Sequence, residues 1–443
     1  MNYLFFLPEK NEIDSNIHLI AYYAILIYII SLFSQYIPVV TNVTMGLLFL
    51  LSLMLLFKKG SGALVKKNKV LLGIVLFYFI LFISVLFSTN KKDGFNLLSD
   101  TIPFFLLAIS FLFIEFKQIT WNRLIRFFAV ATTVASMAGF GAGLYYMRQT
   151  HDTGFLYNDN ICLILGNQAV YFAFYVGIAI LIYIYQLNNK EIQRSGWTYL
   201  AIAWLFMILF LLASRSAMFS LLLILSVYTG GTLLHRKKYM EVAILGLGLI
   251  IGSVVLIKLF PKTLNRFKGT TETEYQFDNQ NMENHFNADF DKNKWNSSNT
   301  RAAIWTCAME VWRTQPLFGT GVGDKKDDLK RKFEEKKFWF ALHTNKNTHN
   351  QYLDVLMSLG LTGLLIFILC YFVYPLWIFI QQKQGFAIMV FLLLALCLIT
   401  ENMFGRYQGI VLIALILPLA SKIEAAKLEK AVEEEEDAYQ QKR

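Results

Sequence analysis

Apolar residues gather along most of this chain in runs long enough to cross a membrane. About twelve such runs occur, at residues 17–37, 39–57, 70–88, 97–116, 124–147, 161–187, 197–213, 216–234, 239–260, 350–380, 386–404 and 407–421. A helix needs about 20 apolar residues to span the hydrocarbon core of a bilayer. The pattern therefore predicts an all-α integral membrane protein with about 12 transmembrane helices. Very short turns join the neighbouring apolar runs near residues 38, 215 and 405, so the number of spans could differ by one or two.

The composition of the chain agrees with this pattern. Of its 443 residues, 56% are apolar and only 16% are charged, whereas a globular domain has about 25% charged residues. A soluble chain could not bury so much apolar surface. A soluble enzyme, a disulfide-stabilised scaffold and a disordered protein are therefore excluded.

Basic residues in the short loops alternate between the two sides of the predicted bundle. One set of loops carries fourteen: Lys58, Lys59, Lys66, Lys67, Lys69, Lys117, Arg123, Arg126, Lys190, Arg194, Arg236, Lys237, Lys238 and Lys383. The other carries five: Lys91, Lys92, Arg148, Arg215 and Arg406. The positive-inside rule then places both termini in the cytoplasm. The same bias accounts for much of the net charge of +10, so no nucleic-acid partner is predicted.

One long polar segment, residues 261–348, interrupts the apolar runs and falls on the outer side. We therefore predict four parts: residues 1–260 with nine spans, a periplasmic loop domain at 261–348, residues 349–421 with three spans, and a cytoplasmic tail at 422–443. In the loop domain, helical spacing predicts an amphipathic helix over 300–315, capped by Asn299 or Thr300, and a charged helix over 324–340.

Polar residues at the outer ends of the spans suggest a site there. The set comprises Asp100, Asn167, Gln168, Arg215, Glu401 and Arg406. Ionisable groups in spans are costly and default to functional hypotheses. Arg215 lies between two apolar runs with almost no loop, so it needs an anionic partner in the protein or in a ligand; alternatively, it extends to lipid headgroups.

Two residues, one within the long segment and one directly after it, have a chemistry suited to catalysis. Thr348 to Gln351 is typical of a capping box, which would place His349 in the first turn of the tenth span. The positive end of that helix would favour a neutral imidazole that can accept a proton. Arg301 shares a helix face with Trp305, which suits an anion or sugar site. An interfacial histidine and an ordinary salt bridge remain the alternatives.

Other motifs fail their tests. Residues 319–323 are rich in glycine but lack the Lys-Ser/Thr ending of a nucleotide loop, so we interpret them as a flexible turn. Asp289 and Asp291 begin like a calcium loop, without the required glycine and glutamate that follow. The four cysteines show no zinc spacing. We therefore predict no metal site and no cofactor.

The region from Arg301 to Gly363 resembles the O-antigen ligase family, which also includes O-antigen polymerases and protein O-oligosaccharyltransferases. The resemblance rests on four short runs in a fixed order: Arg301 to Trp305, Pro316 to Gly321, His349 to Leu353, and Gly360 to Gly363. Together with about twelve spans and one large outer loop, it implies a membrane glycosyltransferase of the GT-C type in the bacterial inner membrane.

The resemblance also implies a reaction and a site. The donor would be a glycan on undecaprenyl diphosphate, the acceptor a hydroxyl of lipid A–core or another molecule, and the reaction metal-independent and inverting. The catalytic residues would be His349, Arg301 and Arg215, with Trp305 and Asn350 in substrate binding beside the two arginines. The ligase, polymerase and protein-glycosylating activities differ only in acceptor. A transporter or flippase is the alternative of another class, although few charges lie near the predicted midplane.

Overall fold

The computed structural model describes residues 15–59, 68–231, 274–278 and 295–440, with isolated positions at 8, 13, 239, 240, 247 and 258. Every regular element in these residues is a helix. Six helices, in the ranges Pro38–Phe57, Lys69–Phe87, Lys91–Phe113, Gln118–Thr150, Ala169–Asn188 and Gln351–Gln381, are long and apolar enough to cross a membrane. Five shorter apolar helices accompany them, at Asn16–Ser31, Gly196–Leu211, Arg215–Tyr228, Gly385–Cys397 and Tyr407–Ile423. The all-α prediction is confirmed.

These helices coincide with eleven of the predicted spans, and only four isolated positions of the remaining one, 239–260, are described. In chain order they are α1 (Asn16–Ser31), α2 (Pro38–Lys59), α4 (Lys69–Phe87), α5 (Lys91–Phe113), α6 (Gln118–Thr150), α7 (Ala169–Asn188), α8 (Gly196–Leu211), α9 (Arg215–Leu225), α16 (Gln351–Ile368), α17 (Tyr374–Gln381), α18 (Gly385–Cys397) and α19 (Tyr407–Gln440). A π-helical segment, Leu369–Val373, joins α16 to α17. The number of spans stays a prediction.

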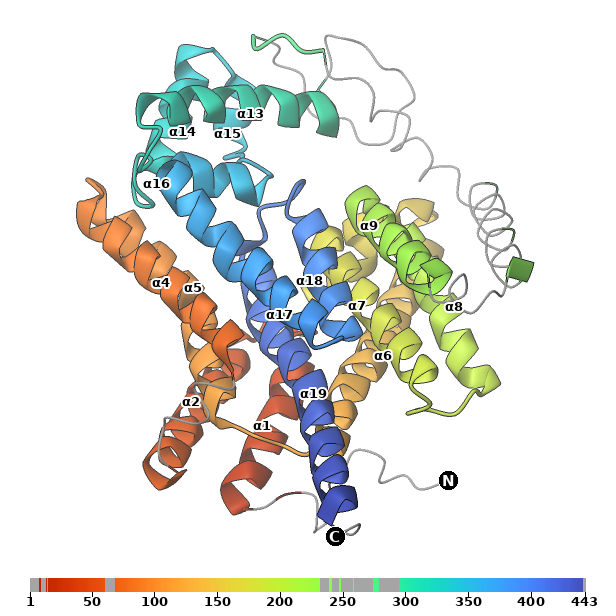
Figure 1. The fold of residues 1–443 in the computed structure, drawn as a ribbon. Helices are drawn as coiled ribbons and strands as arrows, with labels where there is room; N and C mark the ends of the chain where they lie inside the picture. The colour runs from red at the N-terminus through yellow and green to blue at the C-terminus, as the bar shows by residue number, and fades with distance from the viewer. Residues whose placement is uncertain are drawn as a thin grey trace.

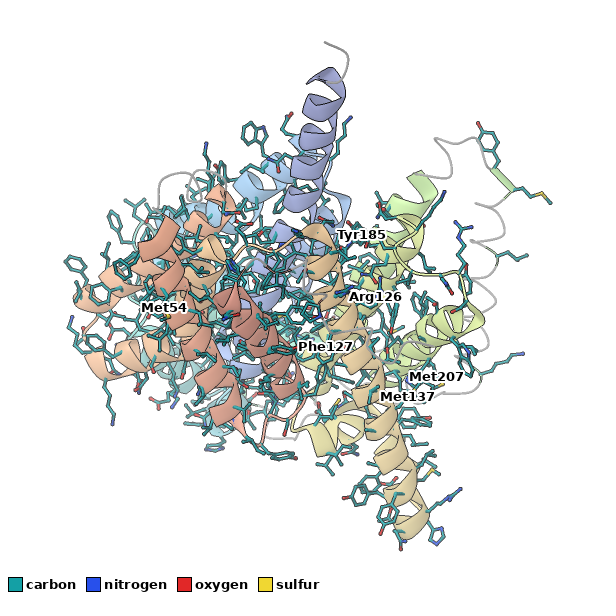
Figure 2. The ribbon with its side chains drawn as sticks, turned by 90° about the horizontal axis from the view of Figure 1, so that it is seen from below. Met54, Arg126, Phe127, Met137, Tyr185 and Met207 are labelled. Atoms are coloured by element: carbon teal, nitrogen blue, oxygen red, sulfur yellow. The ribbon has the colours of Figure 1, made fainter. Side chains whose placement is uncertain are left out.

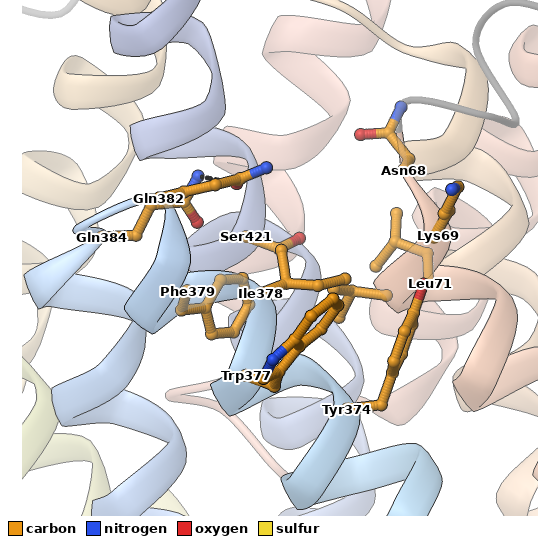
Figure 3. A pocket seen from close by; sticks show the side chains of 11 residues that line it. Asn68, Lys69, Leu71, Tyr374, Trp377, Ile378, Phe379, Gln382, Gln384 and Ser421 are labelled. Carbon is orange, nitrogen blue, oxygen red and sulfur yellow. Dashed lines mark hydrogen bonds between the residues drawn. The ribbon is translucent and has the colours of Figure 1, made fainter.

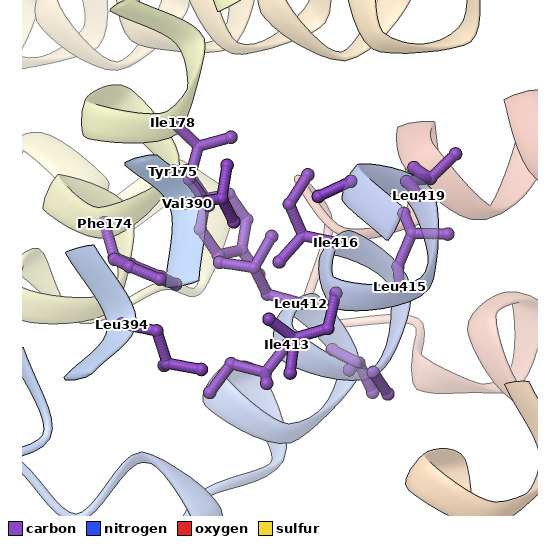
Figure 4. Close-up of a cluster of buried hydrophobic side chains, with 14 of the residues drawn as sticks. Phe174, Tyr175, Ile178, Val390, Leu394, Leu412, Ile413, Leu415, Ile416 and Leu419 are labelled. Carbon is purple, nitrogen blue, oxygen red and sulfur yellow. The ribbon is translucent and has the colours of Figure 1, made fainter. Parts of the chain in front are cut away.

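Helix α7 lies at the centre of the bundle. In its most apolar window 83% of the residues are buried, more than in any of the other five long apolar helices. Figure 4 shows how Phe174 and Ile178 of α7 pack against Leu394 of α18 and Leu412 and Ile416 of α19. This packing fixes the start of α7 and the turn between α18 and α19 relative to one another.

The predicted spans 161–187 and 386–404 are both too long. Residues Asn158–Leu165 form a 3-10 helix, and Gly166 then turns the chain in the left-handed conformation, with φ 65°. Helix α7 begins only at Ala169, whose N–H donates to Asp159 Oδ1 at 2.6 Å. Helix α18 ends at Cys397, and a turn follows. Glu401 therefore lies outside the helices.

Three further helices cover one end of the bundle (Figure 1): α13 (Ser297–Thr314), α14 (Lys325–Glu335) and α15 (Trp339–His343). Helix α13 starts earlier than predicted because Asn296 caps it in a capping box. The predicted helix 324–340 is two helices, since the chain reverses at Lys337, where φ is 58°. A separate apolar cluster that includes Trp295, Ile304 and Phe338 holds the three together.

The glycine-rich loop after α13 is tied into a break in α16, so the interpretation as a flexible turn is wrong. Gly360 interrupts α16 with φ 67° and ψ −168°. The Leu361 N–H donates to the carbonyl of Pro316 at 2.9 Å, and the Gly321 N–H donates to the carbonyl of Ser358 at the same distance. The motif of glycines therefore forms a rigid joint between the loop domain and the bundle.

Replacing Gly319 by alanine should destabilise the protein strongly. Its φ is 70°, and a Cβ there would lie 2.4 Å from the carbonyl carbon of Ser358. The left-handed conformation alone costs a non-glycine residue about 1–3 kcal/mol. We expect a lower midpoint of thermal unfolding in detergent. The control is Gly46→Ala in α2, where a Cβ meets nothing within 4 Å; equal midpoints for the two variants would contradict the joint.

At the end away from α13, polar contacts join the helices. Arg126 of α6, labelled beside Tyr185 in Figure 2, donates to Gln186 Oε1 at 3.2 Å and to the carbonyl of Glu191 at 2.7 Å. Lys422 of α19 pairs with Glu115 at 2.5 Å. At this end, Arg126 and Lys422 therefore join neighbouring parts of the bundle.

Candidate active site

A cavity of about 230 Å³ lies between α13, the start of α7 and the turn before α19. Its lining combines four segments that are far apart in the sequence. The lining residues are Asn158, Asp159, Gln168, Val170, Tyr171, Ser297, Thr300, Arg301, Lys346, Asn347, His349, Glu401 and Arg406. Two of the three predicted catalytic residues, Arg301 and His349, are therefore brought together at one cavity.

Arg301 is held on α13 with part of its guanidinium uncommitted. Its Nη2 lies 2.7 Å from Glu401 Oε1, and its Nη1 donates to the carbonyl of Ser297 at 3.4 Å. The Nε–H is buried and has no hydrogen-bond partner among the described residues. The hydroxyl of Thr300, also in the lining, is likewise buried and without a described partner. Both groups can donate a hydrogen bond to an oxyanion.

Glu401 joins the arginine to the histidine. Its carboxylate is buried, with Oε1 on Arg301 and Oε2 3.5 Å from His349 Nδ1. Burial alone would raise the pKa of Glu401, but the neighbouring guanidinium and the imidazole outweigh it, so the pKa is lowered from its usual value. Glu401 is therefore an anion at neutral pH. It belongs to the polar residues predicted at the outer ends of the spans, but nothing in its sequence context indicated this bridging position.

His349 precedes α16 and does not lie in its first turn. Asn350 is the capping residue: its side chain accepts the N–H of Leu353 at 3.0 Å, so the predicted cap at Thr348 is wrong. His349 has φ 44°, and its N–H donates to Asn347 Oδ1 at 3.0 Å. The carboxylate of Glu401, and not the end of the helix, is thus the group that faces the ring.

Trp305 and Asn350 do not line the cavity. The indole N–H of Trp305 donates to the carbonyl of Thr348 at 2.8 Å. Asn350 uses its side-chain oxygen to cap α16. Both contacts fix the backbone on either side of His349, so these two residues position the histidine from α13 and from α16.

Arg215 reaches the edge of the cavity through Ser297. It is the first residue of α9, three residues separate it from the end of α8, and its Nη2 donates to Ser297 Oγ. Ser297 lines the cavity and Arg215 does not. The predicted short turn is confirmed, since Ala213 adopts φ 51° to make it.

The other polar residues predicted at the outer ends of the spans fall into two groups. Gln168 and Arg406 line the cavity together with Glu401. Asn167 instead donates to the carbonyl of Leu32 at 3.3 Å, and Asp100 is exposed on α5. A polar residue at a span end is thus a weak indicator of the site, and three of the six in this set fall into the lining.

The sequence comparison agrees with this geometry. Residues 200–368 match the family model described as O-antigen ligase. This match supports the O-antigen ligase family. Members of this O-antigen ligase and polymerase type are membrane glycosyltransferases, which use a lipid-linked glycan and a polysaccharide or lipid acceptor. No curated protein matches the chain.

The region similar to the O-antigen ligase family contains the three predicted catalytic residues and six of the thirteen residues that line the cavity. It includes Arg215, α13 with Arg301, and His349 before α16, but it ends before Glu401. Among the described residues, no group of three or more His, Cys, Asp or Glu side chains could hold a metal ion. Asp289 and Asp291 lie outside the described residues.

Proposed function

We propose that this protein transfers a glycan from undecaprenyl diphosphate to a hydroxyl of lipid A–core, as an O-antigen ligase. The reaction would take place at the periplasmic face of the bacterial inner membrane, with both termini in the cytoplasm and a GT-C type architecture. The observation that carries the proposal is the bridge Arg301–Glu401–His349, which joins an anion donor to a proton acceptor in one cavity.

Arg301 and Arg215 would hold the diphosphate of the donor. The bond that breaks joins the anomeric carbon to a phosphate oxygen, so its electron pair moves onto the diphosphate. Donors that already point at this growing charge stabilise the transition state. Arg301 Nε and the Thr300 hydroxyl are buried and without described partners at the cavity. An arginine fork suits phosphate oxygens better than a lysine does.

His349 would act as the general base. With its Nδ1 facing Glu401, the other ring nitrogen is the one that can take the proton of the acceptor hydroxyl. The acceptor oxygen then bonds to the anomeric carbon from the face opposite the diphosphate, which inverts the configuration. Glu401 keeps the ring oriented and stabilises the imidazolium that forms, as the acidic member of a catalytic triad does.

We expect the reaction to be independent of metal ions. The leaving diphosphate needs charge stabilisation rather than a proton, and two arginines can supply it. Purified protein with donor and acceptor should retain full transfer in EDTA. A loss of activity in EDTA that a divalent ion restores would contradict this mechanism.

The acceptor is tested in a deletion strain. Loss of a ligase leaves the polymer on its lipid carrier, whereas loss of a polymerase leaves single repeats on the final acceptor. Unchanged glycans on both lipids, with underglycosylated surface proteins, would assign the protein-glycosylating activity instead. In all three cases the site chemistry is the same, and only the molecule that carries the hydroxyl differs.

A further inference from the structure

A second cavity, of about 220 Å³, lies between the start of α4, the end of α17 and α19. It shares no residue with the active-site cavity. The lining residues are Asn68, Lys69, Val70, Leu71, Tyr374, Trp377, Ile378, Phe379, Gln382, Gln384 and Ser421. Figure 3 shows its polar groups, such as Lys69 and Gln382, along one edge and the rings of Tyr374 and Trp377 along the other. The cavity is therefore amphipathic.

Gln384 brings an unused acceptor to this cavity. Its side chain is 1% exposed, and its Nε2 donates to Gln382 Oε1 at 2.8 Å. Its Oε1 is buried and accepts no hydrogen bond from any described residue. Gln384 precedes α18 without capping it. A buried acceptor without a donor is unfavourable, so a bound molecule with an N–H or O–H group would stabilise this arrangement.

Lys69, also on the polar edge of the cavity, favours an anion. Lys69 is exposed and is the first residue of α4, a helix of 19 residues. The side chain of Asn68, the residue before it, makes no capping hydrogen bond. The positive end of a helix and a lysine beside it attract a phosphate.

The aromatic edge is suited to the lipid interface. The rings of Tyr374 and Trp377 stack with their centroids 6.4 Å apart, and Trp377 is 58% exposed. Tryptophan and tyrosine favour the headgroup level of a bilayer. The loops that hold Lys69 and Lys383 belong to the basic set predicted to face the cytoplasm. The ligand that fits has a phosphate, a hydrogen-bond donor and an apolar chain.

We propose that this cavity binds a cytoplasmic-leaflet phospholipid whose headgroup carries a hydrogen-bond donor. The phosphate lies at Lys69, the ammonium of an ethanolamine headgroup or the hydroxyl of a glycerol headgroup donates to Gln384 Oε1, and the acyl chains begin at Trp377. A choline headgroup has the same phosphate but no N–H or O–H. The site therefore selects against choline lipids.

Binding of added lipid to the full-length protein in detergent, followed by native mass spectrometry, tests the proposal. Palmitoyl-oleoyl phosphatidylethanolamine or phosphatidylglycerol should bind about tenfold more tightly than the matching phosphatidylcholine, the difference expected for one hydrogen bond involving a charged group. Whichever of the two binds more tightly identifies the donor. Equal affinity for all three lipids would overturn the proposal, whatever the behaviour of any variant.

Two variants locate the site. Gln384→Leu should remove the tenfold selectivity and leave phosphatidylcholine binding unchanged. Lys69→Gln should weaken all three lipids alike, whereas Lys92→Gln, an exposed lysine at the start of α5, should change none. Retention of full selectivity in Gln384→Leu would overturn the assignment to this cavity.

Discussion

Replacing His349 by alanine should reduce glycan transfer by about 10²–10⁴-fold, the usual contribution of a general base. The ring is only partly buried, and its one described partner is Glu401. The fold should therefore survive the change, and the midpoint of thermal unfolding should stay close to that of the wild type. Transfer is measured with purified protein, an undecaprenyl-diphosphate-linked glycan and lipid A–core.

The matched control is His343→Ala. His343 ends α15, only six residues earlier, is exposed, and stacks on Trp339 away from the cavity lining. It should transfer glycan at the wild-type rate. A folded His349→Ala protein with full activity would remove the catalytic role of the histidine, and equal losses in both variants would assign the effect to the loop domain as a whole.

A variant of Glu401 tests whether this carboxylate supports catalysis by His349 or binds the substrate. Glu401→Gln keeps a hydrogen-bonding group beside Arg301 and His349 but removes the charge that stabilises the imidazolium. We therefore expect kcat to fall while the KM for the donor changes little. A variant whose KM rises and whose kcat is unchanged would assign Glu401 to substrate binding instead.

The fold was predictable where the physics is local. Every span needs its own apolar run, so eleven of the predicted runs reappear as helices. The errors occur where one residue decides the geometry. Gly166 adopts the left-handed conformation, so α7 begins later in the sequence than predicted. Asn350 rather than Thr348 caps α16. Several residues near a helix start can serve as its cap, and only the packing of the chain selects one.

The site was predictable only in part for a different reason. Arg301 and His349 stand in short motifs, and the resemblance to the O-antigen ligase family singled them out. Glu401 has no motif around it, and it lies 52 positions after His349 in the sequence. Its position depends on how α18 and α19 pack against α7, which no pattern along the chain encodes. The break at Gly360 is similar: the glycines were visible, but not the loop that fills the break.

Replacing Arg301 by glutamine should strongly reduce transfer and also destabilise the protein, and the two effects can be separated. Loss of a donor aimed at the developing charge reduces the rate by about 10²–10³-fold. Breaking a buried ion pair from one side costs about 3–5 kcal/mol, because the other charge stays buried without its partner. The double variant Arg301→Gln/Glu401→Gln leaves no orphaned carboxylate. It should recover most of the lost stability without recovering the transfer rate.

The pH dependence of stability follows from the same pair. The folded-state pKa of Glu401 is lowered, whereas an unfolded glutamate titrates near 4.3. The contribution of the pair is therefore fully present above about pH 4–5 and is lost as the pH falls through the lowered value. The double variant, which has no carboxylate at 401, should lose less stability over this acid range than the wild type does. A double variant that recovers both stability and transfer would show that Arg301 serves only to neutralise Glu401, and the diphosphate would then have to be held by Arg215 and the rest of the cavity.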